Sequence, residues 1–484
     1  MAYDSTAEFV AALEAAGELK RIPAEVDPVL EIAEIADRVV KGGGPALLFE
    51  RVKGHGVPLL INALGSERRM CMALGVSSFE DVATRIRELA NLEIPPTLIE
   101  KLKRLPPLLK LANIGPEVVS SGPCKEVVVR EGAALDFIPA LQCWPEDGGR
   151  YITTPQVYTK DLSGKRNVGM YRMQVFDRAT AGMHWHRHHD GARHYHEHVE
   201  ARKRMEAAVA LGGDPILTYV ATSPLPPGMD ELLFAGFLRQ KKVRLVPCET
   251  VDLEVPADAD IVLEGYLEPG ELRREGPFGD HTGFYSLADD YPVFHLTCFT
   301  RRRNPIYTTT VVGPPPMEDL YLGKATERIF LPLIQMHLPE VVDIHMPAEG
   351  AFHNLVIVSI RKRYPFHARK VMHALWGMGQ MMFAKVIVVV DEDVDVQNLS
   401  EAAWIALSHI DPRRDVCFVD GPAEVLDHAS PRFTAGSKMG VDATRKWKEE
   451  GFERGWPAVA RMSGEVKSLV NRRWKEYGFD PGRT

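Results

Sequence analysis

The sequence predicts a mixed α/β and β fold, in which a β-rich middle domain lies between two α/β domains. The chain has 484 residues, which is enough for about three domains of roughly 150 residues each. Helical and strand-like runs alternate over residues 1–115 and again over 313–441, whereas short strand-like runs dominate residues 116–312. The charged tail, residues 442–484, predicts a terminal helix that packs on a neighbouring subunit.

The first domain is expected to begin with a helix. Ser5 is a suitable N-cap for it, and Phe9 and Leu13 repeat at helical spacing. A second helix and two strands are expected at residues 29–40, 46–50 and 57–62. The proline- and leucine-rich residues 93–115 are interpreted as the linker to the next domain.

The middle domain is expected to be a barrel or a sandwich, because most of its strand-like runs end at Gly, Pro or Asp. These runs are residues 125–130, 155–160, 168–176, 216–221, 261–267, 293–300 and 305–310. Two helices are expected as insertions, at residues 193–211 and 229–239.

The third domain has the alternation of strands and helices that is typical of βαβ units, and it predicts a largely parallel sheet. Its expected strands are residues 341–345, 355–360, 385–390 and 416–419. Its expected helices are residues 319–336, 365–380 and 399–409.

Composition excludes several classes of protein. The 58 basic and 66 acidic side chains give a net charge of −8, which opposes nucleic acid as the main partner. No apolar run is long enough to span a bilayer, and residues 1–30 do not have the pattern of an export signal. The six cysteines form no CxxC pair, so we expect reduced thiols and a cytoplasmic protein.

Common catalytic motifs are absent from the sequence. It contains no GxxxxGK[ST], no complete GxGxxG, no GxSxG and no HExxH. The sequence therefore does not predict a P-loop enzyme, a Rossmann dehydrogenase, a serine hydrolase or a zincin.

Three segments carry side chains suited to a metal ion. Asn167 lies on a strand-like run that ends at Arg172, seven histidines lie between His184 and His198, and Glu231 opens an expected helix. If Asn167, one histidine and Glu231 converge, their oxygen and nitrogen atoms would suit Mn²⁺ or Mg²⁺. Each segment also has a plain structural interpretation: a polar strand, a solvated helix for residues 194–198, and an acid that offsets a helix dipole.

Glu275 and Asp280 are a pair of carboxylates separated by a glycine-rich turn. Like charges near an arginine can raise one pKa so that this group holds a proton near neutral pH, although such a turn can also be purely structural. Lys385 and Lys438 lie next to apolar strands and could bind a phosphate or extend to solvent.

Taken together, these segments resemble the UbiD family of reversible, non-oxidative decarboxylases that use prenylated FMN. The strings EGPFGDHTG, from Glu275, and GSKMGVDAT, from Gly436, are the most specific part of the resemblance. The resemblance implies a split β-barrel flavin-binding middle domain, an α/β domain on either side, and a cofactor held through Mn²⁺ or Mg²⁺ and a potassium ion.

The resemblance also implies roles for single residues. Asn167, His188 and Glu231 match the metal ligands, although the extra histidines near His188 leave the choice of histidine open. Arg172, Glu275 and Asp280 match the catalytic network, in which Asp280 is the proton donor. The positions that match cofactor-binding segments are Asn167, Met170, Tyr171, Arg172, His184, Trp185, His186, His188, His189, Asp190 and Lys385.

The expected reaction is the decarboxylation of an aromatic acid. Loss of CO₂ from an sp² carbon needs an electron sink that no side chain offers. A 4-hydroxy-3-polyprenylbenzoate of the ubiquinone pathway is the first candidate substrate, and a naphthoate of menaquinone synthesis or an acid from aromatic degradation is the alternative.

The resemblance further implies a flavin prenyltransferase as cofactor supplier, a homodimer or hexamer, and a position at the membrane surface if the substrate is polyprenylated. From a different class, residues 184–198 would also suit a histidine-rich metal-binding protein.

Overall fold

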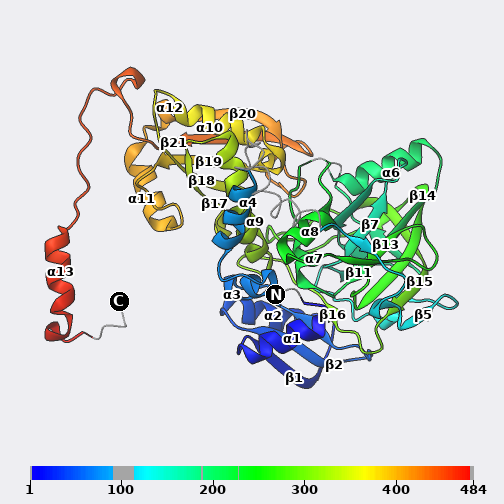
Figure 1. The fold of residues 1–484 in the computed structure, drawn as a ribbon. Coiled ribbons are helices and arrows are strands. Elements are labelled where there is room, and N and C mark those ends of the chain that lie inside the picture. The colour runs from blue at the N-terminus through cyan, green and yellow to red at the C-terminus, as the bar shows by residue number, and fades with distance from the viewer. Residues whose placement is uncertain (1–2, 91–113, 187–188, 227, 480–484) are drawn as a thin grey trace, which may run out of the picture.

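The computed structural model describes residues 3–90, 114–186, 189–226 and 228–479 (Figure 1). The strands form four sheets: one N-terminal, two in the middle of the chain and one C-terminal. The expected linker at residues 93–115 lies almost wholly outside the described residues.

The N-terminal sheet has four strands in the order β1-β2-β3-β16. These are β1 (Leu19–Val26), β2 (Ala46–Val52), β3 (Leu59–Ile61) and β16 (Tyr307–Thr308). β16 was expected among the middle strands, but it pairs in parallel with β3 and so ties the end of the middle region to the first sheet. The accompanying helices are α1 (Thr6–Ala15), α2 (Glu31–Lys41), α3 (Glu67–Leu74) and α4 (Phe79–Ala90).

A nine-stranded antiparallel sheet curls on the right-hand side of the molecule as seen in Figure 1. Its order is β6-β9-β10-β15-β14-β11-β7-β8, and β5 pairs with β15. The strands are β5 (Val127–Val129), β6 (Arg150–Ile152), β7 (Gln156–Lys160), β8 (Arg166–Met170), β9 (Met173–Val175), β10 (Thr180–Met183), β11 (Met205–Leu211), β14 (Ile261–Glu275) and β15 (Asp289–Arg301). A smaller sheet contains β4 (Glu117–Val118), β12 (Arg244–Pro247) and β13 (Glu254–Pro256).

The prediction of a helix over residues 193–211 is wrong in its second half. Only α6 (Asp190–Glu200) is helical, and the alanine-rich residues that follow form β11. Ala208 belongs to the core shared with α1, whereas Val209 belongs to the core on the opposite face of the sheet. Pairing with β7 and β14 therefore outweighs the high helix propensity of alanine.

The prediction of a strand over residues 216–221 is also wrong, because this segment forms α7 (Pro215–Val220). Asp214 accepts a hydrogen bond from the N–H of Ile216 at 3.0 Å, and Pro215 occupies the first turn, where its missing N–H costs nothing. The next helix, α8 (Glu231–Arg239), confirms the expected helix at 229–239 and begins at the N-cap Asp230.

The C-terminal sheet has five strands in the order β17-β18-β19-β21-β20. They are β17 (Val341–His345), β18 (Leu355–Ile360), β19 (Val386–Asp391), β20 (Val416–Pro422) and β21 (Ala435–Asp442). The prediction of a largely parallel sheet holds only for the three central strands, because both edge strands are antiparallel to their neighbours. The helices of this region are α9 (Asp319–His337), α10 (His367–Trp376), α11 (Leu399–His409) and α12 (Pro412–Asp415).

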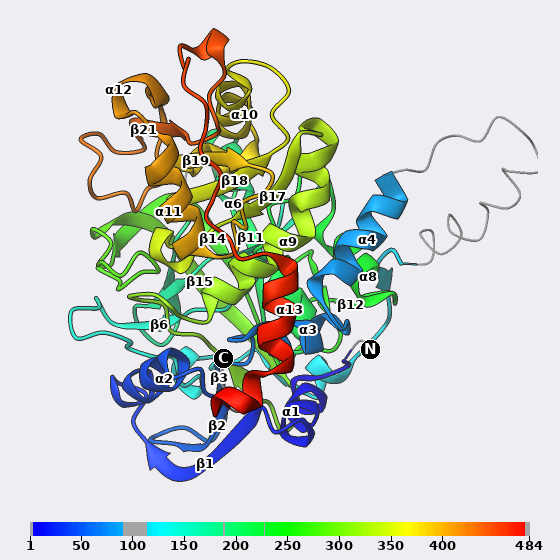
Figure 2. The ribbon, with the colours of Figure 1, turned by 90° about the vertical axis from the view of Figure 1, so that its left-hand side faces the viewer.

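Beyond the five-stranded sheet the chain leads to α13 (Gly464–Arg472), which has no buried residue and stands away from the sheets (Figures 1 and 2). Short 3-10 helices lie at Pro123–Lys125, Leu135–Phe137, Ala348–Gly350, Gly379–Phe383, Lys448–Glu450 and Trp474–Tyr477. Among the described residues, no helix has the length and apolar character needed to cross a membrane.

Candidate active site

The candidate site lies where three strands of the nine-stranded sheet begin or end. Arg172 directly precedes β9, His184 directly follows β10, and Glu275 is the last residue of β14. β9 and β10 are paired so that Met173 faces Met183, and the N–H of His184 donates to the carbonyl of Arg172 at 3.2 Å. The sheet thus brings together residues that are about 100 positions apart.

The Arg172 guanidinium bridges both predicted catalytic carboxylates. Its Nε donates to Glu275 Oε1 at 3.1 Å, and its Nη1 forms an ion pair with Asp280 Oδ2. A second donor, Nη2, lies 3.1 Å from Ser286 Oγ, and the guanidinium sits 4.5 Å from the centre of the Phe278 ring. Glu275 is fully buried and Asp280 is 6% exposed, so these charges interact with little screening by water.

Asp147 helps to fix the loop that carries Asp280. This buried carboxylate accepts hydrogen bonds from the N–H groups of Gly279 at 2.8 Å and of Cys143 and Trp144 at 2.9 Å. The turn also needs glycine at 276, where φ is +92° and a Cβ would meet the backbone of Ala288 at 3.1 Å.

The two carboxylates do not have the pKa pattern that the sequence predicted. Burial would raise the pKa of each, but the charge of Arg172 and the hydrogen bonds from His184 to Glu275 and from His281 to Asp280 outweigh burial. The pKa of Glu275 is lowered, and that of Asp280 is held well below its usual range. Both groups are therefore ionised in this arrangement, because one guanidinium lies between them.

The predicted metal ligands Asn167 and Glu231 lie close to each other on neighbouring elements. Asn167 is buried on β8, and the N–H of the next residue, Val168, donates to Glu231 Oε2 at 3.3 Å. Burial raises the pKa of Glu231 to about 7, and the described chain forms no ion pair with it. The third predicted ligand, His188, lies outside the described residues.

Tyr171 and the aromatic residues that follow β10 form one wall next to this pair. Asn167 Nδ2 donates to the Tyr171 hydroxyl at 3.4 Å, and the Tyr171 ring lies 6.1 Å from Trp185 and 5.3 Å from His189. A Cβ at Gly169 would come within 2.2 Å of the Tyr171 ring, so only glycine admits the ring there.

The histidines of the loop after β10 connect this wall to the catalytic carboxylates. His184 Nδ1 is 2.9 Å from Glu275 Oε2, and its Nε2 is 2.8 Å from His186 Nε2. Burial and neighbouring positive charge lower the pKa of His184 and of His186, so both rings are neutral near pH 7. His186 Nδ1 also lies 3.5 Å from Glu424, which follows β20 in the C-terminal sheet.

Other predicted residues lie elsewhere. Asp190 is exposed and pairs with Arg193 at 3.0 Å, and Met170 packs against the core shared with α1. Lys385 pairs with Asp427 at 2.7 Å within the C-terminal region and lines a cavity of about 220 Å³. Lys438 is buried, with Nζ 3.3 Å from the carbonyl of Ala384.

The expectation that His194, His196 and His198 are solvated surface is wrong for two of the three. His194 is buried, and its Nδ1 lies 2.9 Å from Thr159 Oγ1. His198 is also buried and hydrogen-bonds the carbonyl of His194, whereas His196 is exposed. α6 lies against β7 and β8, which explains why one of its faces is covered.

Sequence reasoning missed several residues of this site. His281 directly follows Asp280 in the EGPFGDHTG string, and its position next to the predicted catalytic acid was the available signal. Asp147, Ser286 and Glu424 gave no signal, because each reaches the site only through the fold: Asp147 through the N–H of Gly279, Ser286 through Arg172 and Glu424 through His186.

The same order of regions is found in models of one protein family. Residues 10–89, 117–315 and 320–443 match the N-terminal, Rift-related and C-terminal domains of 3-octaprenyl-4-hydroxybenzoate carboxy-lyase. The chain belongs to the UbiD family. An uncharacterized protein of Archaeoglobus fulgidus is 51% identical to this UbiD family member, and the match spans 97% of this chain and 98% of the relative. An uncharacterized protein of Aquifex aeolicus is 52% identical, and the match spans 97% of each chain. This membership makes the protein a carboxy-lyase.

Solved structures of UbiD-class enzymes share its fold. The closed form of vanillic acid decarboxylase from Sedimentibacter hydroxybenzoicus aligns with a TM-score of 0.85 at 28% identity over 99% of both chains. The open form of that enzyme aligns at 0.80 over 98% of this chain and 100% of its own. An evolved dimeric form of HmfF from Pelotomaculum thermopropionicum, in complex with prFMN, aligns at 0.78 and 30% identity over 96% and 100% of the two chains.

Proposed function

We propose that this protein catalyses the reversible, non-oxidative decarboxylation of an aromatic acid with prenylated FMN, and that Asp280 is the proton donor. The observation that carries the proposal is the Arg172 guanidinium, on a side chain that is 9% exposed, between the buried carboxylates of Glu275 and Asp280. A guanidinium in this position can bind a substrate carboxylate while Asp280 stays next to it. The proton donor then lies close to the carbon that loses CO₂, which is the carbon that has to be protonated.

The residues of this chain would act in separate ways. Glu275, ionised and held by His184, keeps Arg172 in position. A substrate carboxylate would compete with Asp280 for Arg172, because both are anions that bind the same guanidinium. Asp280 would then be free to take up a proton and deliver it to the ring carbon.

The cofactor proposal is supported by the chemistry of the residues near β8. The half-buried carboxylate of Glu231 and the buried amide of Asn167 supply oxygen donors for Mn²⁺ or Mg²⁺, and His188 is the proposed nitrogen ligand. Trp185 Nε1 is buried without a hydrogen-bond partner in the described structure, so it is available to a bound group. Prenylated FMN would supply the electron sink that no side chain offers.

Roles for the remaining predicted residues follow from this placement. Tyr171, Trp185, His186 and His189 would surround the flavin, whereas the Met170 side chain would reach it only by leaving the core shared with α1. Lys385 would have to break its ion pair with Asp427 to bind the flavin phosphate. The potassium ion would bind the same phosphate. Asp190 is exposed and paired with Arg193, so its proposed role needs the side chain to leave Arg193 for the cofactor.

The first candidate substrate is a 4-hydroxy-3-polyprenylbenzoate, because the matched family domains are described by a 3-octaprenyl-4-hydroxybenzoate reaction. A naphthoate of menaquinone synthesis and acids of aromatic degradation are the alternatives, and a structural relative acts on vanillic acid. A flavin prenyltransferase would supply the cofactor, and the working form would be a homo-oligomer.

The test uses the full chain co-expressed with a flavin prenyltransferase. A panel of 4-hydroxybenzoate, vanillate, 3,4-dihydroxybenzoate, 1,4-dihydroxy-2-naphthoate and a short-chain 4-hydroxy-3-prenylbenzoate is incubated in D₂O, and deuterium is measured at the ring position that carried the carboxylate. At least one acid should be decarboxylated with label at that carbon. Metal analysis should find a divalent ion that Glu231→Gln loses.

Asp280→Asn should abolish both product formation and deuterium exchange while the flavin spectrum is retained, because an amide cannot deliver the proton. Asp290→Asn is the matched control, since Asp290 is an exposed acid near the start of β15. Normal turnover by Asp280→Asn would refute the proposed role of the aspartate.

The histidine-rich metal-binding alternative predicts several bound zinc ions and no flavin. Two observations disfavour it: His194 and His198 are buried in hydrogen bonds, and no group of three potential ligands from His, Cys, Asp and Glu is found among the described residues.

A further inference from the structure

Two histidines link the nine-stranded sheet to the C-terminal sheet beside Asp280, and the proposed function leaves them unused. His281 follows Asp280 in the loop after β14, and His353 lies in the segment just before β18. Their Nε2 atoms are 2.8 Å apart although the residues are 72 positions apart in the chain.

The two rings continue a line of polar contacts that starts at the carboxylate. His281 Nδ1 lies 3.0 Å from Asp280 Oδ1, so the ring joins Asp280 on one side and His353 on the other. His353 Nδ1 is buried and has no hydrogen-bond partner in the described structure. The next residue, Asn354, lines the cavity of about 220 Å³ together with Asp427. The line of contacts therefore ends one residue away from the wall of this cavity.

The two residues before His353 have a strained backbone, and this conformation brings the His353 side chain into contact with His281. Ala351 and Phe352 have φ of 45° and 48°, in the left-handed region that residues with a side chain rarely adopt. The Phe352 ring stacks on His281 at 5.3 Å and contacts Gly323 of α9, where a Cβ would lie 3.0 Å from the ring. The strain is thus compensated by packing that fixes both histidines.

The charged groups around the pair favour a proton on His281, next to Asp280. Burial would lower the pKa of His281, but Asp280, with help from Asp319 of α9 and Glu424, raises it. Burial and the charge of His281 lower the pKa of His353 to about 3, against the opposing charges of Asp280 and Asp427. A proton is thus held more tightly on His281 than on His353.

We propose that His281 and His353 form a proton relay that reloads Asp280 from the cavity between the two sheets. The relay rests on the proposed function, because it assumes that Asp280 gives a proton to the product in each turnover. Neither histidine touches a reacting atom, and both act through Asp280. His281 lies in a loop of the nine-stranded sheet and His353 lies just before a strand of the C-terminal sheet. The relay is therefore complete only while these two sheets are in contact.

The transfer balances with water as the only co-reactant. We assign the starting tautomers so that His353 donates from Nε2 to His281 and His281 donates from Nδ1 to Asp280. A hydronium proton in the cavity binds His353 Nδ1, the Nε2 proton of His353 moves to His281 Nε2, and the Nδ1 proton of His281 moves to Asp280 Oδ1. One O–H bond of hydronium and two N–H bonds break, two N–H bonds and one O–H bond of Asp280 form, a water molecule is left, and tautomer exchange resets the neutral rings.

The first experiment uses the holoenzyme with an acid that it turns over. His353→Ala should lower kcat by about 10- to 100-fold with little change in KM or flavin spectrum, as expected for lost proton transfer. The solvent deuterium isotope effect on kcat should increase, because proton delivery becomes the slowest step. Added imidazole should restore His353→Ala but not His353→Gln, whose side chain fills the space without carrying a proton.

His428→Ala is the matched control, because His428 also crosses between the sheets, stacking on Phe284 at 4.2 Å, but has no contact with His281 in the described structure. It should keep the wild-type isotope effect. The relay is overturned if His353→Ala keeps the wild-type kcat, if imidazole does not restore it, or if His428→Ala reproduces its isotope effect.

A second measurement needs neither flavin nor substrate. In the flavin-free protein, histidine ¹³Cε1 NMR should show a pKa of His281 above the ordinary value, and Asp280→Asn should lower it. A His281 pKa that Asp280→Asn does not move would also overturn the relay. If the wild-type holoenzyme turned over none of the acids, the proposed function would fail, whereas this titration would still decide whether the hydrogen-bonded pair exists.

Discussion

At the scale of single residues, Arg172 organises the site. One planar guanidinium bonds Glu275, Asp280 and Ser286 at the same time, which the single ammonium of lysine could not reproduce in this geometry. Its charge keeps two buried carboxylates ionised next to each other. The resting site is therefore charged and paired, and proton uptake by Asp280 has to be coupled to the release of Arg172.

Asp319, at the start of α9, gives a residue-scale prediction of pH-dependent stability. Burial, together with the charges of Asp280 and Glu318, raises its pKa to about 7 against the opposing charge of His281, and its Oδ2 has no hydrogen-bond partner in the described chain. The folded state therefore prefers the protonated acid. The resulting stability is complete below the unfolded pKa and is lost as the pH rises through 7.

We expect Asp319→Asn to remove this loss. Between pH 5 and pH 8 the wild-type protein should lose about 1–3 kcal/mol more stability than the variant, at about 1.4 kcal/mol per pKa unit with allowance for solvent relaxation. Thermal midpoints at several pH values would measure the difference, with the exposed Asp290→Asn as control. Parallel pH profiles for wild type and Asp319→Asn would contradict the prediction.

At the scale of elements, the site depends on the connection between β14 and β15. Glu275 ends β14 and is held in register with Asp289 of β15, whereas Asp280 lies on the glycine-rich loop between these strands. Asp147, from a separate segment, accepts the N–H of Gly279 in that loop and the N–H groups of Cys143 and Trp144 in its own segment, and so ties the two segments together. The distance between the two carboxylates and Arg172 is thus set by a strand end and by one buried cap.

Asp147→Ala should loosen the loop and lower activity more than flavin binding. Leaving buried N–H groups unpaired should cost about 1–3 kcal/mol of stability, and Asp280 should lose its fixed position. Chemical unfolding, kcat and flavin content would be measured together. The matched control is Asp161→Ala, because Asp161 also accepts backbone N–H groups but lies in an exposed turn. Equal effects of the two substitutions would contradict the assignment.

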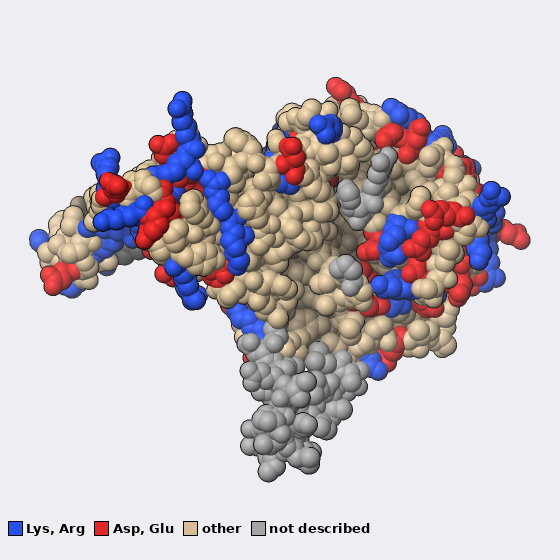
Figure 3. Space-filling view, turned by 90° about the horizontal axis from the view of Figure 1, so that it is seen from above, with Lys and Arg blue, Asp and Glu red and all other residues tan. Residues whose placement is uncertain are grey.

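At the scale of the whole molecule, the site is completed where two sheets meet. His186 contacts Glu424, and Phe284 stacks on His428, so the nine-stranded sheet and the C-terminal sheet touch through side chains. Acidic and basic groups are mixed on the face seen in Figure 3, and its middle carries few charges.

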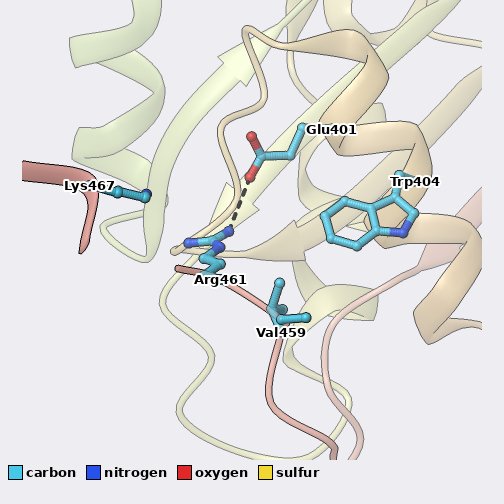
Figure 4. Close-up of a pocket in the computed structure, with 6 residues that line it drawn as sticks. Glu401, Trp404, Val459, Arg461 and Lys467 are labelled. Atoms are coloured by element: carbon cyan, nitrogen blue, oxygen red, sulfur yellow. Dashed lines mark hydrogen bonds and ion pairs between the residues drawn. The ribbon is translucent and has the colours of Figure 1, made fainter. Parts of the chain in front are cut away.

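The C-terminal tail is the other feature at this scale. An open hollow of about 410 Å³ lies between α11 and the tail, where Arg461 pairs with Glu401 at 3.4 Å beside Trp404 (Figure 4). On α13, Val466 and Leu469 are exposed at a spacing of three residues, which forms one apolar row. This row supports the proposal that the tail packs on another copy of the chain.

Removing residues 458–484 should lower the molar mass of the protein in solution from an oligomer toward the single chain. Leu469→Asp should have the same effect with less disturbance, because it places a charge in the apolar row. Light scattering coupled to size-exclusion chromatography would measure the mass. Leu162→Asp, at an exposed leucine outside the tail, serves as control. An unchanged mass in both tail variants would contradict a role of the tail in assembly.

Local sequence signals predicted helices correctly where a helix cap or the helical spacing of apolar residues agreed with the packing of the folded chain. The expected helix at 399–409 is α11 within the same bounds, and its N-cap Asn398 accepts a hydrogen bond from the N–H of Glu401. They failed at β11 and α7, where strand partners and an Asp-Pro start outweighed side-chain propensity. The carboxylates and the arginine of the site could be predicted from the sequence, but Glu424 and His353 could not.

The sequence by itself determined the family, the alternation of α/β and β regions, and the chemical types gathered at the site, because these depend on local periodicity and on short strings such as EGPFGDHTG. Only the tertiary structure decided that Asp280 is ionised, that Lys385 pairs with Asp427, and that His281 meets His353. The reason is physical: a pKa or a proton path depends on burial and on charges brought together from distant segments, and no local pattern encodes those distances.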